Sequence, residues 1–139
     1  MLRKRKINGR IVRGKGEAAF FTQLDWVQKQ CLEKLGFSPY PGTLNLKVSG
    51  EGITALETLQ KSHKGLCLTS PDPNFCDANV WPVYIREISC ALIIPAEEVR
   101  IHGRHIIEIL SPLRVKDVLK VGDGDMLTVE FEEAGGRSF

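Results

Sequence analysis

Two residues with neutral side-chain oxygens, Thr43 and Asn45, are separated by one apolar residue in the stretch Gly42-Thr43-Leu44-Asn45-Leu46. Alternating polar and apolar residues are typical of a half-buried strand, in which Thr43 and Asn45 share one face. A hydroxyl and a carboxamide about 6–7 Å apart along the backbone are suitable ligands for magnesium when substrate phosphates balance its charge. The pair also fits the solvated face of an ordinary strand, so both interpretations stay open.

The residues just before this strand predict a stiff turn. Pro39 and Pro41 each fix one φ angle, and Gly42 can adopt a conformation that is closed to most residues. The aromatic residues Phe37 and Tyr40 lie at the edge of this turn. They either line a site for a flat ligand or belong to the core.

Glu108 is a lone carboxylate in the otherwise apolar run of residues 106–110. In an alternating strand it shares a face with Ile106 and Leu110. Glu108 therefore lies either on a half-solvated face or in a pocket, where it accepts a hydrogen bond or a proton from a ligand.

Two segments have backbone groups suited to an anion. The first is a loop with two alternating glycines, which can turn its amides toward a phosphate while a lysine adds charge: Gly14, Lys15, Gly16, Glu17, Ala18 and Ala19. The second follows Ser111-Pro112, which we interpret as a helix cap and a first-turn proline. It leads through Leu113, Arg114, Val115 and Lys116. Plain connecting loops would look similar.

The remaining pattern predicts a small, mainly antiparallel β-barrel of six strands with two or three short helices. We expect strands at residues 7–12, 43–46, 80–85, 89–94, 106–110 and 126–131, with a further short strand possible at 66–68. A helix is expected at residues 24–35, and Gly36 is expected to end it. A second helix is expected at residues 53–59, after a turn at 50–52. A short helix is also expected after Pro112. Pro82 predicts an edge or a bulge in its strand.

With 139 residues, 42% of them hydrophobic, the chain is expected to form one domain over residues 1–139. Residues 1–6 are interpreted as a basic extension and residues 133–139 as a frayed tail. The first 15 residues contain no acid but several cations, which either attract phosphates or form a solvated terminus: Arg3, Lys4, Arg5, Lys6, Arg10, Arg13 and Lys15.

The four cysteines, Cys31, Cys67, Cys76 and Cys90, lack close Cys-x-x-Cys spacing. We therefore expect neither a zinc site nor a disulfide framework, as in a reduced cytoplasmic protein. No apolar run reaches the ~20 residues that a membrane-spanning helix requires. A membrane partner is not expected.

Taken together, these motifs resemble those of the archaeal-type CTP-dependent riboflavin kinases. The resemblance rests on the glycine loop at residues 14–17, on Leu35-Gly36-Phe37 with the turn and strand at 39–46, on the run at 106–109 followed by Pro112, and on Asp123-Gly124-Asp125. They occur in the same order as in that family, over most of residues 7–131.

The resemblance implies a cradle-loop β-barrel that transfers the terminal phosphoryl group of CTP to riboflavin, giving FMN and CDP. Thr43 and Asn45 would then bind magnesium, residues 14–19 and 113–116 would bind the nucleotide, and Glu108 would contact the flavin and take part in catalysis. Lys15, Arg114 and Lys116 would add positive charge. A monomer without a nucleic-acid partner is expected.

The chain departs from the family pattern at a few positions. Ala18 stands where a third glycine is usual, the order of the basic pair Arg114 and Lys116 is reversed, and residues 96–99 lack the flavin-side threonine. An alternative function also remains. The ending from Gly122 to Val129 resembles that of swapped-hairpin barrels that bind DNA as regulators.

Overall fold

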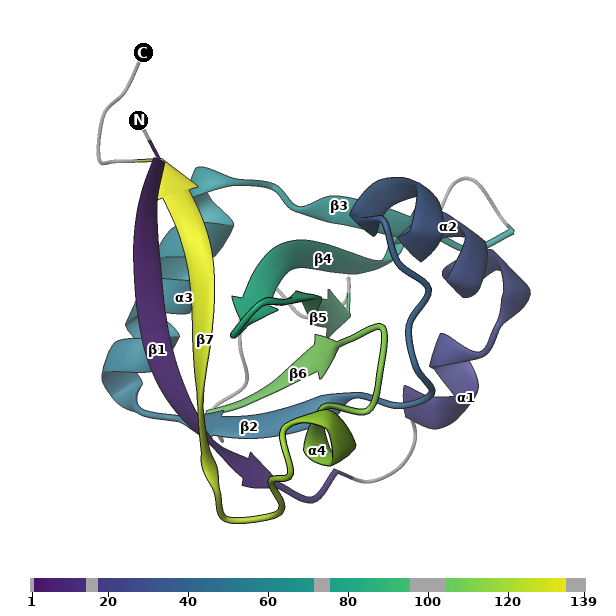
Figure 1. Cartoon of the computed structure of the whole chain (residues 1–139). Coiled ribbons are helices and arrows are strands. Elements are labelled where there is room, and N and C mark those ends of the chain that lie inside the picture. The colour runs from purple at the N-terminus through teal and green to yellow at the C-terminus, as the bar shows by residue number, and fades with distance from the viewer. Residues whose placement is uncertain (1, 15–17, 72–75, 96–104, 135–139) are drawn as a thin grey trace.

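Seven antiparallel strands form a ring in the computed structural model, which describes residues 2–14, 18–71, 76–95 and 105–134 (Figure 1). The order of strands in the sheet is β3-β4-β5-β6-β2-β1-β7, and a further pairing between β4 and β7 closes the ring. The strands are β1 (Leu2–Val12), β2 (Leu44–Val48), β3 (Leu66–Thr69), β4 (Cys76–Ile85), β5 (Ile88–Pro95), β6 (Ile106–Leu110) and β7 (Met126–Ala134). The predicted mainly β barrel is confirmed, with seven strands instead of six.

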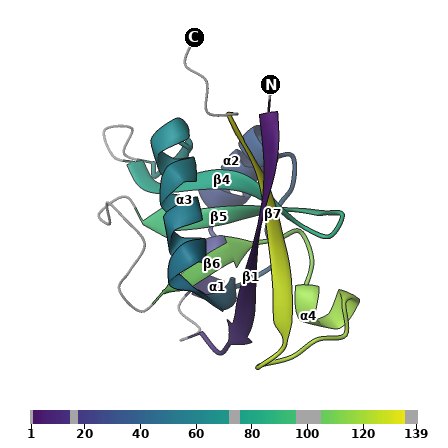
Figure 2. The same cartoon turned by 90° about the vertical axis from the view of Figure 1, so that its left-hand side faces the viewer.

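Among the described residues, four helices accompany the strands: α1 (Ala18–Thr22), α2 (Asp25–Leu35), α3 (Gly50–Ser62) and α4 (Val115–Val118). Figures 1 and 2 show α3 beside β1 on one side of the ring, whereas α1 and α2 lie on the far side from it. The prediction for α2 is confirmed, including its end at Gly36. The φ of Gly36 is 84°, and its amide donates to the carbonyls of Cys31 and Leu32.

The expected turn at residues 50–52 is wrong, because these residues form the first turn of α3. Ser49 caps the helix, since its side chain accepts a hydrogen bond of 3.1 Å from the Gly52 amide. Two nearby glycines obscured this cap in the sequence. α3 is consequently longer than expected and contributes buried residues to the barrel interior, among them Ala55 and Leu56.

The two ends of the described chain are part of the sheet. β1 begins at Leu2 and β7 continues to Ala134, and the two strands pair along residues 2–10 and 126–134. Residues 2–6 are thus part of β1 and not an extension, so that interpretation is wrong for them. Likewise, residues 133 and 134 belong to β7 and not to a frayed tail. β7 supplies acidic partners: Lys4 is opposite Glu132, and Lys6 is opposite Glu130.

Pro82 lies within β4 opposite Ala91 of β5. On the other side of β4, pairing with β3 covers residues 76–80 and pairing with β7 covers residues 84 and 85. On that side of β4, Pro82 therefore lies in the interval between the two partners, where a missing amide proton interrupts no ladder.

In the part of the chain that the structure describes, two apolar clusters stabilise the fold, one on each face of the sheet. The main cluster fills the barrel and is covered by α3; its fully buried members include Ile11, Leu46, Leu56 and Phe131. The second cluster lies between α2 and the outer face of β3 to β6. Its buried members are Val27, Cys31, Phe37, Leu68, Val80, Ala91 and Leu110.

The cysteines differ in part from the expectation. Cys31 and Cys90 are free and buried, and burial raises the pKa of the Cys31 thiol to about 11 and that of the Cys90 thiol to about 12. Cys67, however, is disulfide-bonded, so the expectation that the cysteines form no disulfide is wrong.

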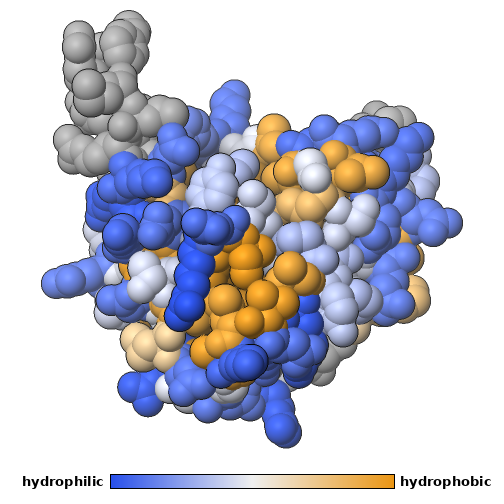
Figure 3. Space-filling view, viewed as in Figure 1, coloured by the Kyte–Doolittle hydropathy of each residue, from blue (hydrophilic) through white to orange (hydrophobic). Residues whose placement is uncertain are grey.

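The face seen in Figure 1 carries an apolar area over β6 and α4, bordered by hydrophilic side chains (Figure 3). Leu113, Leu119 and Val121 are only partly buried and pack against the main cluster. Val118 of α4 is exposed. Within the described ranges, no helix combines the length and apolar character needed to cross a membrane.

Candidate functional site

Thr43, Asn45 and Glu108 lie together on the outer face of the barrel. β2 pairs with β6 so that Asn45 is opposite Glu108, and the buried Leu44 and Leu46 point into the core. The Thr43 hydroxyl donates a hydrogen bond of 2.8 Å to a Glu108 carboxylate oxygen. The Asn45 amide nitrogen donates to the Thr43 carbonyl at 3.2 Å. The structure therefore brings together two proposed metal ligands and the proposed flavin contact.

Gly14 borders this cluster from β1. Val12 is opposite Asn45 in the ladder, and Gly14 follows two residues later. A Cβ atom added to Gly14 would lie 2.3 Å from the Asn45 amide nitrogen, far closer than two such atoms can approach. The absence of a side chain at residue 14 thus leaves room for the Asn45 carboxamide.

The rest of the predicted glycine loop is described only in part. Lys15, Gly16 and Glu17 lie outside the described residues. Ala18 and Ala19 form the first turn of α1, an element that the sequence analysis did not predict.

The segment after β6 approaches the Pro-Gly turn. The amide of Tyr40 donates a hydrogen bond of 2.7 Å to the carbonyl of Ser111, which is buried. The prediction that Ser111 caps the following helix is wrong: its hydroxyl donates to the Leu113 carbonyl, and the cap position of α4 is Arg114. The helix is therefore confined to four residues.

Both cations of this segment are in ion pairs. Arg114 contacts Asp117, and the Lys116 ammonium lies 2.9 Å from an Asp123 oxygen. Arg13 reaches the other Asp123 oxygen at 3.9 Å. The hydrogen bond from Lys116, followed by the charges of Lys116 and Arg13, lowers the pKa of Asp123. Exposed pairs of this kind are weak, so a ligand phosphate can compete with the carboxylates for these cations.

The two aromatic residues of the turn have different environments. Phe37 is buried in the second apolar cluster, so it belongs to the core and does not line a site for a flat ligand. Tyr40 is 45% exposed, so its ring is accessible from solvent. Phe20 of α1 is also exposed.

The cluster supplies only oxygen ligands for a cation. Thr43 and Asn45 contribute neutral oxygens, and Glu108 contributes a carboxylate. Such oxygens suit magnesium, which usually completes its coordination with water and substrate phosphates. Over the residues that the structure describes, no group of three or more His, Cys, Asp or Glu side chains could hold a metal ion instead. The residues therefore fit magnesium bound together with a phosphate ligand.

Two residues at this site were missed by the sequence analysis. Thr22 ends α1 and Gln28 lies in α2, and both bond to the turn that precedes Thr43. A buried threonine at the end of a five-residue helix has no signal in the sequence, because its partner is 20 residues away.

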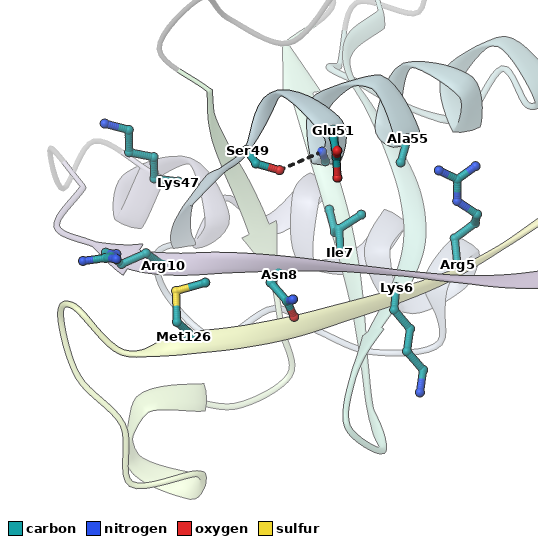
Figure 4. Close-up of a pocket in the computed structure, with 11 residues that line it drawn as sticks. Arg5, Lys6, Ile7, Asn8, Arg10, Lys47, Ser49, Glu51, Ala55 and Met126 are labelled. Atoms are coloured by element: carbon teal, nitrogen blue, oxygen red, sulfur yellow. Dashed lines mark hydrogen bonds between the residues drawn. The ribbon is translucent and has the colours of Figure 1, made fainter.

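A concavity of about 730 Å³, separate from the cluster around Thr43, lies between β1, the start of α3 and the end of β2 (Figure 4). Its lining includes four cations, Arg5, Lys6, Arg10 and Lys47, and one carboxylate, Glu51. Part of this charge is compensated, since Lys6 lies 3.9 Å from a Glu130 oxygen.

Comparison with known proteins points to one family. A family model named for a CTP-dependent riboflavin kinase, and described as the domain of unknown function DUF120, matches residues 11–131. Proteins named riboflavin kinase are similar over most of the chain. The protein of Archaeoglobus fulgidus is 35% identical over 129 residues, and that of Ignicoccus hospitalis is 32% identical over 127 residues.

The matches cover most of this chain but a smaller share of each relative. The matches extend over 90% of this chain and 54% of the Archaeoglobus protein, and over 88% of this chain and 69% of the Ignicoccus protein. For a riboflavin kinase of Pyrobaculum islandicum, which is 30% identical, the values are 90% and 59%. The chain thus spans little more than half the length of several of these relatives.

Proposed function

Because this chain belongs to the family of CTP-dependent riboflavin kinases, we propose that it transfers the terminal phosphoryl group of CTP to riboflavin, giving FMN and CDP. The observation that carries the proposal is the Thr43, Asn45 and Glu108 cluster, which combines cation ligands with a carboxylate. Phosphoryl transfer depends mainly on positioning and on neutralising charge, and this cluster can serve both.

Thr43 and Asn45 are proposed to hold magnesium through the hydroxyl and the carboxamide oxygen. When bound, the ion would neutralise phosphate charge during transfer. Gly14 leaves the Asn45 carboxamide the space for this orientation. The Thr43 hydroxyl, which now donates to Glu108, can keep that bond while its lone pairs face the ion.

Glu108 is proposed to accept the proton of the riboflavin hydroxyl that attacks the terminal phosphorus. A carboxylate accepts hydrogen bonds with four lone-pair sites, so it can hold Thr43 and an acceptor hydroxyl at once. The neighbouring backbone is rigid, because β6 is paired on both sides, with β2 and with β5. The carboxylate is therefore held in one place relative to Thr43 and Asn45.

The nucleotide is proposed to lie between residues 14–19 and residues 113–116. Lys15, Arg114 and Lys116 would supply charge to the phosphates, and backbone groups of Gly14, Gly16, Glu17, Ala18, Ala19, Leu113 and Val115 would supply hydrogen bonds. The cytosine edge is small, so a pocket formed by backbone donors and acceptors around it excludes a purine.

The test is an assay for FMN. The protein is incubated with riboflavin, magnesium and one nucleoside triphosphate at a time, and flavins are separated by chromatography. We expect FMN with CTP and far less with ATP, GTP or UTP. Equal yields from all four would overturn the choice of donor, and no FMN with any of them would overturn the kinase.

The alternative of a DNA-binding regulator receives less support. It was based on the ending from Gly122 to Val129 and on the basic amino-terminal segment. That segment forms β1, which pairs with β7 and places Lys4 opposite Glu132 and Lys6 opposite Glu130. A duplex-mobility assay distinguishes the two functions. A salt-dependent shift without any nucleotide turnover would favour the regulator.

A further inference from the structure

Thr22 has the most completely buried polar side chain among the residues that the structure describes, with 0% exposure. Its hydroxyl donates to the Ala18 carbonyl at 2.9 Å, with the Ala19 carbonyl 3.2 Å away. The same oxygen accepts a hydrogen bond of 2.8 Å from the Gly42 amide. A hydroxyl has one proton to donate and lone pairs to accept, so both bonds form together.

These two bonds join the start of α1 to the turn before Thr43, and the proposed reaction requires these two segments to keep a fixed relative position. Ala18 and Ala19 follow the glycine loop directly, and Gly42 directly precedes Thr43. The backbone at Gly42 is a left-handed turn with a φ of 96°. Its amide is outside the ladders of β2 and finds its acceptor in the Thr22 side chain.

Neighbouring bonds extend this connection. The side-chain amide of Gln28 donates to the carbonyl of Thr22 and, at 2.9 Å, to the carbonyl of Pro39. From the same turn, the Tyr40 amide donates to Ser111. The start of α1, the turn before β2 and the start of the 111–116 segment are thus linked by a short chain of hydrogen bonds.

We propose that Thr22 is a positioning residue that couples the nucleotide-binding loop to the magnesium ligands. Its hydroxyl fixes Gly42, and hence Thr43 and Asn45, relative to α1. Nucleotide phosphates held at one end are thereby aligned with the ion held at the other. This inference rests on the proposed function.

Thr22→Val tests the bond without changing the volume of the side chain. Valine offers neither a donor nor an acceptor, so the partly buried Gly42 amide loses its partner. Thr22→Ser restores the hydroxyl. Val27→Ala is a matched control, because Val27 is fully buried in the second apolar cluster and its removal destabilises the same region without breaking this bond.

The measurement is the affinity for CTP by calorimetry, with and without magnesium, for the wild type and the three variants. In the wild type we expect magnesium to tighten CTP binding. In Thr22→Val this gain falls by about three- to tenfold, the size expected for one net hydrogen bond. Thr22→Ser and Val27→Ala should retain the gain in CTP affinity. This holds for Val27→Ala even if its melting temperature falls as much as that of Thr22→Val.

Hydrogen exchange of the free protein gives a second readout. We expect faster exchange of the Gly42 amide in Thr22→Val, extending to the amides of Thr43 and Asn45, and no such pattern in Val27→Ala. The proposal is overturned if Thr22→Val keeps the full magnesium gain, or if Val27→Ala loses it equally. A wild type whose CTP affinity ignores magnesium would instead contradict the proposed function.

Discussion

The hydroxyl of Thr43 donates a 2.8 Å hydrogen bond to the carboxylate of Glu108, although the two residues are 65 positions apart in the chain. The pairing of β2 with β6 creates this contact by placing Asn45 opposite Glu108. A proposed cation ligand and a candidate base are therefore fixed to one another by the sheet itself. Substitutions at these residues can separate their roles.

Glu108→Gln should lower the rate of FMN formation by about 10²–10⁴-fold, the usual contribution of a general base. The amide keeps the shape of the side chain and can still accept from Thr43, so the fold should persist. Riboflavin affinity should fall more than CTP affinity. Steady-state rates and separate calorimetric titrations with each ligand measure these effects.

Glu130→Gln is the matched control for this substitution. Glu130 is a partly buried carboxylate on β7 that faces Lys6 and lies outside the proposed site. Its variant should retain the activity of the wild type. An equal loss of affinity for riboflavin and CTP in Glu108→Gln would argue against a flavin-side role for Glu108.

Thr43→Ala and Asn45→Ala should each lose activity and leave the fold largely intact, because neither side chain is buried in the core. We expect each loss to be about tenfold or more at limiting magnesium, as for the removal of one ligand contact of about 1.4 kcal/mol. Thermal melting and a magnesium titration of turnover measure the two effects independently. Thr128→Ala, which removes an exposed hydroxyl bonded to Asn8, serves as the control. Wild-type activity in either site variant at limiting magnesium would refute the metal assignment.

Local patterns predicted much of the fold. The alternation at residues 43–46 gave β2, and the spacing of Val27 and Cys31 with a stop at Gly36 gave α2. The charged start of β1 was misjudged because its acidic partners on β7 are more than 120 residues away. Local sequence carries no information about such a pairing, and basic residues alone look like a solvated terminus.

The sequence allowed the residues of the candidate site to be predicted, but not the contacts between them. Thr43 and Asn45 could be recognised as neighbours on one strand, whereas the contact with Glu108 depends on the register between β2 and β6. Thr22 is further from prediction still, since its proposed role depends on a single bond to a distant backbone amide. Ser49 left a signal that was missed: a capping serine followed by an acid in the first turn of α3.

Asp123 should make stability depend on pH in the acid range. Its hydrogen bond with Lys116 lowers the pKa of the carboxyl from 3.8, so the folded protein binds this proton less readily than the unfolded chain. The contribution is fully present above about pH 4 and is lost as the pH falls through the lower folded value. The difference in melting temperature between wild type and Asp123→Asn should therefore close below about pH 4. A difference that stays constant down to pH 2 would contradict this assignment.

Cys31 and Cys90 should resist alkylation in the folded protein. Burial raises the pKa of their thiols to about 11 and about 12, so little thiolate forms at pH 8, and both sulfurs are shielded from reagent. Labelling with iodoacetamide before and after unfolding, followed by peptide mass mapping, measures this. Both residues should be modified only after unfolding. Rapid labelling of Cys31 in the native state would show that α2 detaches from the sheet.

Gly14→Ala should abolish most of the activity while the barrel stays folded. The φ of Gly14 lies outside the left-handed region, so alanine can adopt the same backbone conformation. The new methyl group, however, would lie 2.3 Å from the Asn45 amide nitrogen. The Asn45 carboxamide must then turn away, which breaks the hydrogen bond from its nitrogen to the Thr43 carbonyl. We expect a rise in the magnesium concentration needed for half-maximal turnover, with a smaller change in melting temperature. Gly50→Ala is the control, since a methyl group there meets no atom within 4 Å and favours the first turn of α3. Gly14→Ala with unchanged magnesium dependence would mean that the Asn45 carboxamide does not act at the metal.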